Sequence, residues 1–211
     1  MLRYQTIPVT PFEQNCSLVW CDQTLQAAVI DPGGDLPRIR AAVQAHQLTL
    51  TQILLTHAHI DHAGGTGTLA RELKLPIVGP HPGDQFWIDG LPQQAQMFGF
   101  APAEPFTPTR WLHGGDTVQV GHSTLAVRHC PGHTPGHVIF HNAEAARAFV
   151  GDVLFAGSIG RTDFPGGDLD TLLASIRNQL WPLGDDTVFI PGHGPESSFG
   201  RERRHNPFVH D

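Results

Sequence analysis

The feature that most constrains this sequence is a cluster of histidine and aspartate that directly follows a short apolar run. The run Gln52–Thr56 predicts a buried strand, and the segment His57–His62 after it has the pattern His-x-His-x-Asp-His. Imidazole nitrogens and carboxylate oxygens are both good ligands for zinc-like ions. For a chain of this composition, a pattern with four such fixed positions is expected by chance about 0.004 times per chain. The segment therefore predicts a metal site rather than an ordinary polar turn.

Three further candidate ligands occupy similar positions. His133 lies in a Cys-Pro-Gly-His-Thr-Pro-Gly segment, Asp152 comes soon after the run Phe149–Val150, and His193 comes soon after the run Phe189–Ile190. Ligands at the same end of neighbouring strands can converge, as they do at the carboxyl edges of open sheets. Adjacent glycines let the backbone turn sharply there. We therefore expect one metal centre built from His57, His59, Asp61, His62, His133, Asp152 and His193.

The rest of the chain predicts short strands mixed with helices in two similar halves. This order favours an α/β protein with helices outside sheet layers, and the length suits a single domain over residues 1–211. Asp35 is expected to cap the first helix. The predicted strands are Cys16–Trp20, Ala27–Ile30, Gln52–Thr56, Thr117–Val120, Thr124–Val127, Val138–Phe140, Ala148–Val150 and Thr187–Ile190, and the predicted helices are Asp35–Gln47, Gly65–Leu75 and Asp168–Trp181.

Composition excludes several classes of partner. The net charge of −7 makes a nucleic-acid partner a poor expectation, because binding a phosphate backbone requires cations. No apolar run approaches the roughly 18 residues that a membrane span needs, so no membrane interaction is expected. The N-terminal residues have no long apolar stretch, and three cysteines make no disulfide framework. We therefore expect a cytoplasmic protein.

The His-x-His-x-Asp-His segment, followed in order by His133, Asp152 and His193, resembles the metallo-β-lactamase superfamily. Within it, the chain is similar to the short, single-domain bacterial form of the glyoxalase II group, the hydroxyacylglutathione hydrolases. The resemblance runs from about Asn15 to Asn206, and it implies a four-layer αββα sandwich with a dinuclear metal site at one edge. It implies that the first metal is held by His57, His59 and His133, the second by Asp61, His62 and His193, and that Asp152 and a water-derived hydroxide bridge both.

The activity that the resemblance implies is hydrolysis of glutathione thioesters such as S-lactoylglutathione. Asp61 and Asp152 are then the catalytic residues together with the hydroxide, which attacks the thioester carbonyl. The thiolate leaves without a strong general acid, because thiol pKa values are about 8–9. The donor set accepts two Zn²⁺ ions, with iron or manganese as alternatives. Asp31 matches a motif whose carboxylate supports the ligand loop, although an ordinary strand-end turn explains it too.

The residues that contact the substrate, and the roles of several other side chains, are not decided by the sequence. Arg161 could hold a substrate carboxylate, or it could pair with Asp163 and pin its loop. The aromatic-rich segment Gln85–Trp111 is either a lid or substrate wall between the two halves, or a loop whose aromatic rings anchor it on the core. Longer glyoxalase II enzymes carry a C-terminal helical domain that contacts glutathione, whereas this chain ends 18 residues after His193. His137 is a candidate support for the ligands, and the expected surface or capping histidines are His81, His113, His122, His129 and His141.

Other functions remain in competition, and neither the native metal nor the oligomeric state follows from the sequence. A mononuclear-iron glutathione persulfide dioxygenase of the same fold shows a stretch like Gly160–Phe164. Other ester, lactone or β-lactam hydrolases of this fold are further alternatives. A non-catalytic metal-binding protein is the alternative from a different class, and the complete set of seven ligands argues against it.

Overall fold

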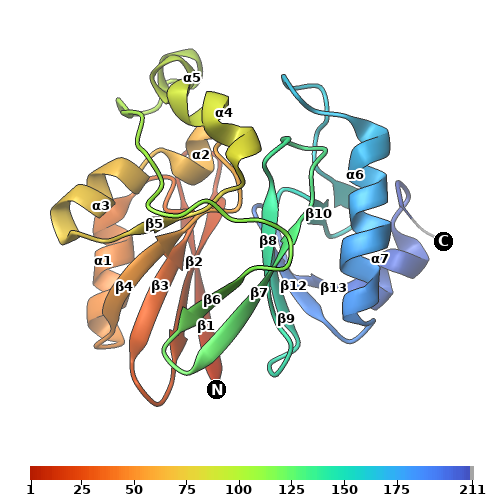
Figure 1. Cartoon of the computed structure of the whole chain (residues 1–211), viewed down its shortest axis with the longest axis horizontal. Coiled ribbons are helices and arrows are strands. Elements are labelled where there is room, and N and C mark those ends of the chain that lie inside the picture. The colour runs from red at the N-terminus through yellow and green to blue at the C-terminus, as the bar shows by residue number, and fades with distance from the viewer. Residues whose placement is uncertain (210–211) are drawn as a thin grey trace.

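In the computed structural model, which describes residues 1–209, two β-sheets lie face to face between outer layers of helices (Figure 1). The first sheet has five strands in the order β1-β2-β3-β4-β5, and α1 and α3 cover its outer face. Its strands are β1 (Leu2–Val9), β2 (Gln14–Cys21), β3 (Gln26–Ile30), β4 (Thr49–Leu54) and β5 (Ile77–Val78), and its helices are α1 (Leu36–Ala45) and α3 (Thr66–Leu73).

The second sheet has six strands in the order β13-β12-β9-β8-β7-β6, and α6 and α7 cover its outer face. Its strands are β6 (Thr117–Val120), β7 (Ser123–His129), β8 (Val138–Asn142), β9 (Arg147–Gly151), β12 (Val188–Pro191) and β13 (Ser197–Ser198). A small hairpin is formed by β10 (Leu154–Phe155) and β11 (Ser158–Ile159), and the helices are α6 (Leu169–Ser175) and α7 (Phe199–His205).

Alternation along the central strands creates three apolar layers. In β9, Phe149 packs between the two sheets, whereas Ala148 and Val150 pack against the outer helices. In β2, Leu18 and Val19 divide in the same way between the helix side and the inter-sheet side. Strands buried on both faces read as continuous apolar runs, which is why these segments were visible in the sequence. The structure confirms the predicted four-layer αββα sandwich.

Parallel pairing places the carboxyl ends of the key strands at one edge. β3 pairs in parallel with β4, and β9 pairs in parallel with β12. Parallel neighbours end on the same side of a sheet, so the loops that follow them emerge together. The candidate site lies among these loops.

Three local expectations need correction. Strand β1 was not predicted. Asp35 does not cap α1: it has a left-handed backbone (φ 48°), and its carboxylate accepts the backbone N–H of Thr10 at 2.8 Å. The predicted helix Asp168–Trp181 is α-helical only to Ser175, where a π-helical turn and then a 3₁₀ turn take over. Asp168 does cap α6, since its side chain accepts the N–H of Thr171 at 2.8 Å.

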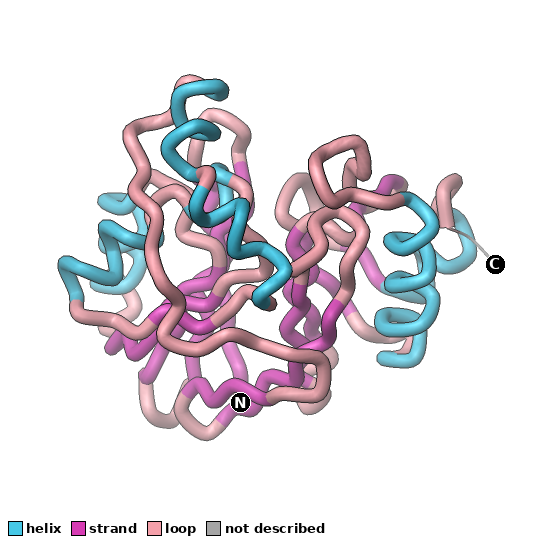
Figure 2. Tube along the Cα trace, turned by 45° about the horizontal axis from the view of Figure 1, so that its top comes forward, coloured by secondary structure: helices cyan, strands magenta, loops and turns pink. Residues whose placement is uncertain are grey.

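The aromatic-rich segment Gln85–Trp111 is part helix and part loop. It contains α4 (Gln85–Asp89) and α5 (Leu91–Phe98), which rise above the strand ends in Figure 1. The long loop after α5 then crosses from the half of the molecule with the first sheet to the half with the second (Figure 2). Phe100, Phe106 and Trp111 anchor this loop on the first core, as one of the two expectations had it.

Two other sequence expectations meet the structure here. Among the helices of residues 1–209, none is long and apolar enough to cross a lipid bilayer. The three cysteines are buried and free.

Candidate metal centre

The loops at the shared sheet edge bring all seven predicted metal ligands together. The loop after β4 runs directly into the short helix α2 (Ile60–Ala63), so the His-x-His-x-Asp-His segment is half loop and half helix. Helix α2 itself was not predicted. His57 and His59 lie on this loop, Asp61 and His62 on α2, His133 on the loop after β7, Asp152 directly after β9, and His193 in the loop after β12.

Three histidines form a first group with the spacing of a metal site. One ring nitrogen from each of His57, His59 and His133 lies within 4.8 Å of the other two. His59 Nδ1 is 3.0 Å from His133 Nε2. All three side chains are buried.

Asp61, His62 and His193 form a second group of the same kind. Their ligand atoms also lie within 4.8 Å of one another. His193 Nε2 is 3.0 Å from Asp61 Oδ2, and His62 Nε2 is 3.6 Å from the same oxygen. The side chain of His193 is 30% exposed, so this group opens further toward solvent than the first.

Asp152 lies between the two groups. Its Oδ1 is 3.3 Å from His62 Nε2, while its Oδ2 is 3.6 Å from His133 Nε2 and 3.7 Å from His193 Nε2. A Cβ on Gly192 would overlap the Asp152 carboxylate, so the glycine before His193 makes room for it. Asp152 is therefore the one predicted ligand whose carboxylate approaches both groups.

Four of the five histidines are held through Nδ1, which leaves Nε2 directed at the other ligands. An Nδ1–H bond to an oxygen fixes both the tautomer and the ring orientation, as outer partners of metal-binding histidines do. The acceptors are the Thr56 hydroxyl for His57 (3.0 Å), the Asp31 carboxylate for His62 (2.9 Å), the Arg161 carbonyl for His133 (2.7 Å) and the Phe12 carbonyl for His193 (3.1 Å).

Asp31 connects the two groups through hydrogen bonds to Thr56 and His62. Its Oδ2 accepts the Thr56 hydroxyl at 2.6 Å and the His62 Nδ1–H at 2.9 Å, and its Oδ1 accepts the Thr56 N–H at 2.8 Å. Because the Thr56 hydroxyl donates its hydrogen bond to Asp31, its oxygen lone pair is free to accept the His57 Nδ1–H. The buried carboxylate thus supports one histidine of each group, beyond simply ending a strand.

Electrostatics differ between the two groups. Burial lowers the pKa of His57 and of His59 well below the ordinary value, and the neighbouring histidines add to this, so both rings are neutral. Burial opposes charge on His62 too, but the carboxylates of Asp152 and Asp61 outweigh it and raise the His62 pKa well above its ordinary value. Burial would raise the pKa of Asp152, whereas His62, His133 and His193 hold it well below the usual range.

The donor set fits divalent metal ions. Buried polar atoms ordinarily have hydrogen-bond partners, yet His57 Nε2, His59 Nε2, His62 Nε2 and Asp152 Oδ1 are buried without one. Two of them, His62 Nε2 and Asp152 Oδ1, lie 3.3 Å apart. A cation bound among nitrogen and carboxylate donors would satisfy them, and zinc, iron and manganese all accept such ligands.

Asp84 supports the site and was missed by sequence reasoning. Its buried carboxylate accepts the Ala58 N–H at 3.0 Å, the Thr134 hydroxyl at 2.9 Å and the Gly136 N–H at 2.6 Å. Burial raises the pKa of Asp84 to about 7 despite these three donors. The carboxylate therefore joins the loop of His57 and His59 to the loop of His133. Nothing in the local sequence signals this role, since the donors come from two distant segments.

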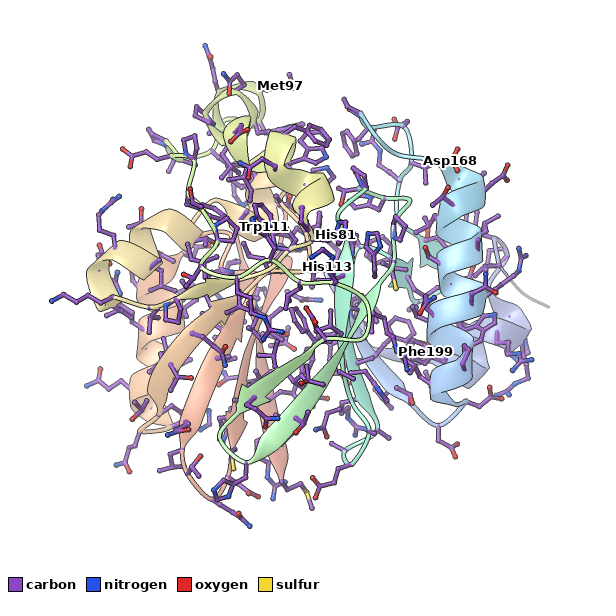
Figure 3. The ribbon with its side chains drawn as sticks, in the orientation of Figure 1. His81, Met97, Trp111, His113, Asp168 and Phe199 are labelled. Atoms are coloured by element: carbon purple, nitrogen blue, oxygen red, sulfur yellow. The ribbon has the colours of Figure 1, made fainter. Side chains whose placement is uncertain are left out.

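The remaining histidines divide into supports and peripheral residues. His137 stacks on His57 with ring centroids 4.6 Å apart and accepts the Asp152 N–H at 3.1 Å, as expected of a support. His81 accepts the Gly83 N–H and caps a 3₁₀ turn, near His113 in Figure 3. The expectation that His141 is a surface or capping residue was wrong. Strand β8 is covered on both faces, and the ring of His141 is buried.

Replacing Asp84 by Asn is expected to weaken the first group. An amide has one acceptor oxygen, so either Gly136 N–H or Ala58 N–H would face an NH₂ group. A buried unpaired donor costs about 1–3 kcal/mol, and we expect the free energy of unfolding to fall by that amount, with weaker metal binding. Urea unfolding and metal titration of Asp84→Asn measure both effects. Asp89→Asn, at an exposed carboxylate on α4, is the matched control, and equal metal affinity in the two variants would contradict the prediction.

The predicted substrate contact Arg161 lines a cavity of about 600 Å³ over the candidate ligands. Its guanidinium donates to both carboxylate oxygens of Asp163, at 2.9 and 2.7 Å, and lies 4.5 Å from the centroid of the Phe164 ring. The loop-pinning pair is therefore present. A contact between Arg161 and substrate stays a prediction.

Comparison with known proteins agrees with this fold. The sequence profile of the metallo-beta-lactamase superfamily matches residues 9–193, and the chain belongs to this superfamily. Membership in this family of metallo-hydrolases supports hydrolase activity. More particularly, the chain is 45% identical over 209 residues to the hydroxyacylglutathione hydrolase GloC of Haemophilus influenzae, covering 99% of this chain and 98% of that protein.

Solved structures of differently named proteins share this fold. The BLEG-1 B3 metallo-beta-lactamase superimposes with a TM-score of 0.89 at 37% identity, covering 98% of this chain and 99% of that one. TTHA1623 in a di-iron-bound form gives 0.88 at 39% identity, covering 97% and 100%. ETHE1 from Myxococcus xanthus gives 0.81 at 29% identity, covering 98% and 84%. The fold is common to all three, so the particular reaction has to be argued from the site.

Proposed function

We propose that this protein is a metal-dependent hydrolase of glutathione thioesters such as S-lactoylglutathione. The observation that carries the proposal is the convergence of seven buried or half-buried histidine and aspartate side chains in two groups, with Asp152 between them. The similarity to a hydroxyacylglutathione hydrolase over nearly the whole chain supports the substrate class. We assign His57, His59 and His133 to a first metal, Asp61, His62 and His193 to a second, and Asp152 to both.

Two divalent ions, Zn²⁺ in our proposal, would occupy these groups, and the di-iron form of TTHA1623 makes iron the main alternative. When bound, such ions lower the pKa of water from about 15.7 toward about 7 and polarise a carbonyl oxygen. Two ions and two aspartates give a net positive centre, which suits the negative charge that develops as a thioester carbonyl is attacked.

The chain's own residues set the geometry of the reaction. Asp61 and Asp152 line the cavity over the centre, and in our proposal their carboxylates orient the attacking water. His62 and His193 are held by Asp31 and by the Phe12 carbonyl, so they keep their direction during turnover. The leaving thiol has a pKa of about 8–9 and departs as a thiolate. We therefore assign no general acid.

Metal analysis followed by a thioester assay tests this proposal. We expect about two metal ions per chain and hydrolysis of S-lactoylglutathione that is lost when the metal is removed and restored when it is added back. The assay follows loss of the thioester absorbance and release of free thiol with a disulfide reagent. Metal-replete protein that cleaves no thioester would contradict the proposal.

A second candidate is oxidation of glutathione persulfide. The resemblance of the stretch Gly160–Phe164 favours it, whereas the presence of Asp61, His62 and His193 as a second ligand group favours the hydrolase. One bound iron, with oxygen consumed only when glutathione persulfide is added, would identify this activity. We expect no oxygen uptake.

A further inference from the structure

The cavity over the candidate metal centre has a mainly apolar wall. Its lining includes the candidate ligands His59, Asp61, His133, Asp152 and His193, so the cavity opens directly onto the centre. The rest of the lining is dominated by aromatic rings, from Phe12, Phe86, Trp87, Phe98, Phe155 and Phe164. A small-molecule pocket of this size is ordinarily apolar with a few polar groups that fix orientation.

Exposed apolar side chains concentrate at this cavity. Phe12, Phe86, Met97 and Phe98 line it, and each is at least 41% exposed, with Met97 at 76%. Met97 lies on α5, the helix that rises above the strand ends (Figure 3). Large apolar groups held together in water form a surface that favours an apolar ligand.

The apolar wall is attached to the candidate ligands. The Phe12 carbonyl accepts the His193 Nδ1–H at 3.1 Å, and the Phe12 ring contacts Phe98 at 6.0 Å between centroids. On the other side, the rings of Trp87 and Phe164 lie 4.5 and 5.0 Å from the ring of His59. A group that fills the cavity would thus lie beside both halves of the centre, within reach of a bond cleaved there.

Inside the cavity the charged ends of glutathione find few charged partners, although Gln93 and Gln94 add neutral polar side chains to the lining. Within the described residues 1–209, Arg161 is the single Lys or Arg side chain in the lining, and it is already paired with Asp163. Glutathione carries two carboxylates and an ammonium group, which call for several charged or polar partners. The wall is suited to hydrocarbon instead.

We propose that this cavity binds a hydrocarbon group of the substrate, an alkyl chain or an aromatic ring carried on one side of the thioester. The inference rests on the proposed thioester hydrolysis and narrows its substrate class. The preferred substrate is then a thioester that carries a hydrocarbon group, and we expect it to be cleaved faster than S-lactoylglutathione. The hydrocarbon can belong to the acyl group or to the thiol, and the test separates the two.

Two series of substrates test the proposal. In the first, glutathione is constant and the acyl group grows from acetyl through butanoyl to hexanoyl. In the second, the acetyl group is constant and the thiol grows from ethanethiol to hexanethiol. We expect kcat/KM to rise in one series by about threefold to fourfold for each methylene that becomes buried. Flat or falling values in both series would overturn the inference.

Variants connect the chain-length dependence to this wall. In Met97→Gln/Phe98→Gln we expect the rise per methylene to fall by at least half. Leu73→Gln/Leu169→Gln is the matched control, since both leucines are exposed on helices and outside the cavity lining. Met97→Gln alone is a second test, because a side chain that is 76% exposed bears little on folding. An unchanged slope in folded Met97 and Phe98 variants would overturn the inference.

A binding measurement separates this inference from the proposed function. Calorimetric titration of metal-replete protein with butanoate, hexanoate and octanoate needs no turnover. We expect the dissociation constant to fall with chain length, and to do so less steeply in Met97→Gln/Phe98→Gln. If no thioester is cleaved but this trend appears, the hydrocarbon site stands and thioester hydrolysis fails. If thioesters are cleaved and the carboxylates bind equally, the hydrocarbon site fails.

Discussion

Asp152→Ala is expected to lose bound metal from both ligand groups and to lower thioester kcat/KM by roughly a thousandfold or more. The Asp152 carboxylate is the only predicted ligand that approaches His62, His133 and His193 together, at 3.3 to 3.7 Å. Metal ions contribute several kcal/mol of transition-state stabilisation, and each 1.36 kcal/mol corresponds to about tenfold in rate. Elemental analysis of the purified variant and steady-state kinetics measure both losses.

Two further variants show whether this loss comes from the position of the carboxylate. Asp152→Asn keeps the shape and one acceptor oxygen but removes the negative charge, so we expect an intermediate metal content. Asp186→Ala removes an exposed carboxylate in the turn before β12 and should bind metal and turn over substrate as the unmodified chain does. An Asp152→Ala protein that keeps both metal ions and most of its activity would rule out our assignment of Asp152.

The ligand cluster was predictable because its physical cause is local. A buried strand is a short apolar run, and residues directly after it emerge at the sheet edge, so pattern and position together indicate a site. The parallel pairs β3–β4 and β9–β12 then place Asp31, the His57 loop, Asp152 and His193 at a common edge. Strand β1 was missed because Arg3, Gln5 and Pro8 interrupt its apolar residues. Its place at the sheet edge tolerates such residues.

The supporting contacts were beyond prediction because they join distant segments. The Asp84 carboxylate accepts hydrogen bonds from Ala58 and Thr134, which are 26 and 50 positions away in the sequence. Phe12 contributes a backbone carbonyl to His193 across 181 positions, which no side-chain pattern can indicate. Asp35 shows the converse case, since its position suited a helix cap, yet its carboxylate binds the backbone N–H of Thr10 instead. Such competition is decided by packing rather than by local preference.

Metal removal is expected to lower the melting temperature by roughly 8–16 °C near neutral pH. A ligand present at about a thousand times its dissociation constant contributes about 4 kcal/mol, and a chain of this size melts about 2–4 °C lower for each kcal/mol lost. Chelator-treated and metal-restored samples are compared by calorimetry. An equal melting temperature in the two samples would contradict a metal centre in this cluster.

The difference in melting temperature between metal-restored and chelator-treated protein should depend on pH in a defined direction. Carboxylates raise the pKa of His62 and, through Asp61 and Asp152, that of His193, so without metal both rings hold protons below their raised pKa values. Metal has to displace these protons, so its stabilising effect shrinks as the pH falls and widens as the pH rises through those values. His57 and His59 are neutral already, because burial lowers their pKa values.

We therefore expect acidification to release metal from the group of Asp61, His62 and His193 before it releases metal from the group of His57, His59 and His133. Stepwise dialysis from pH 7 to pH 5, with metal counting at each step, would reveal the order. Simultaneous loss of both ions would show that the two groups bind metal as a single unit.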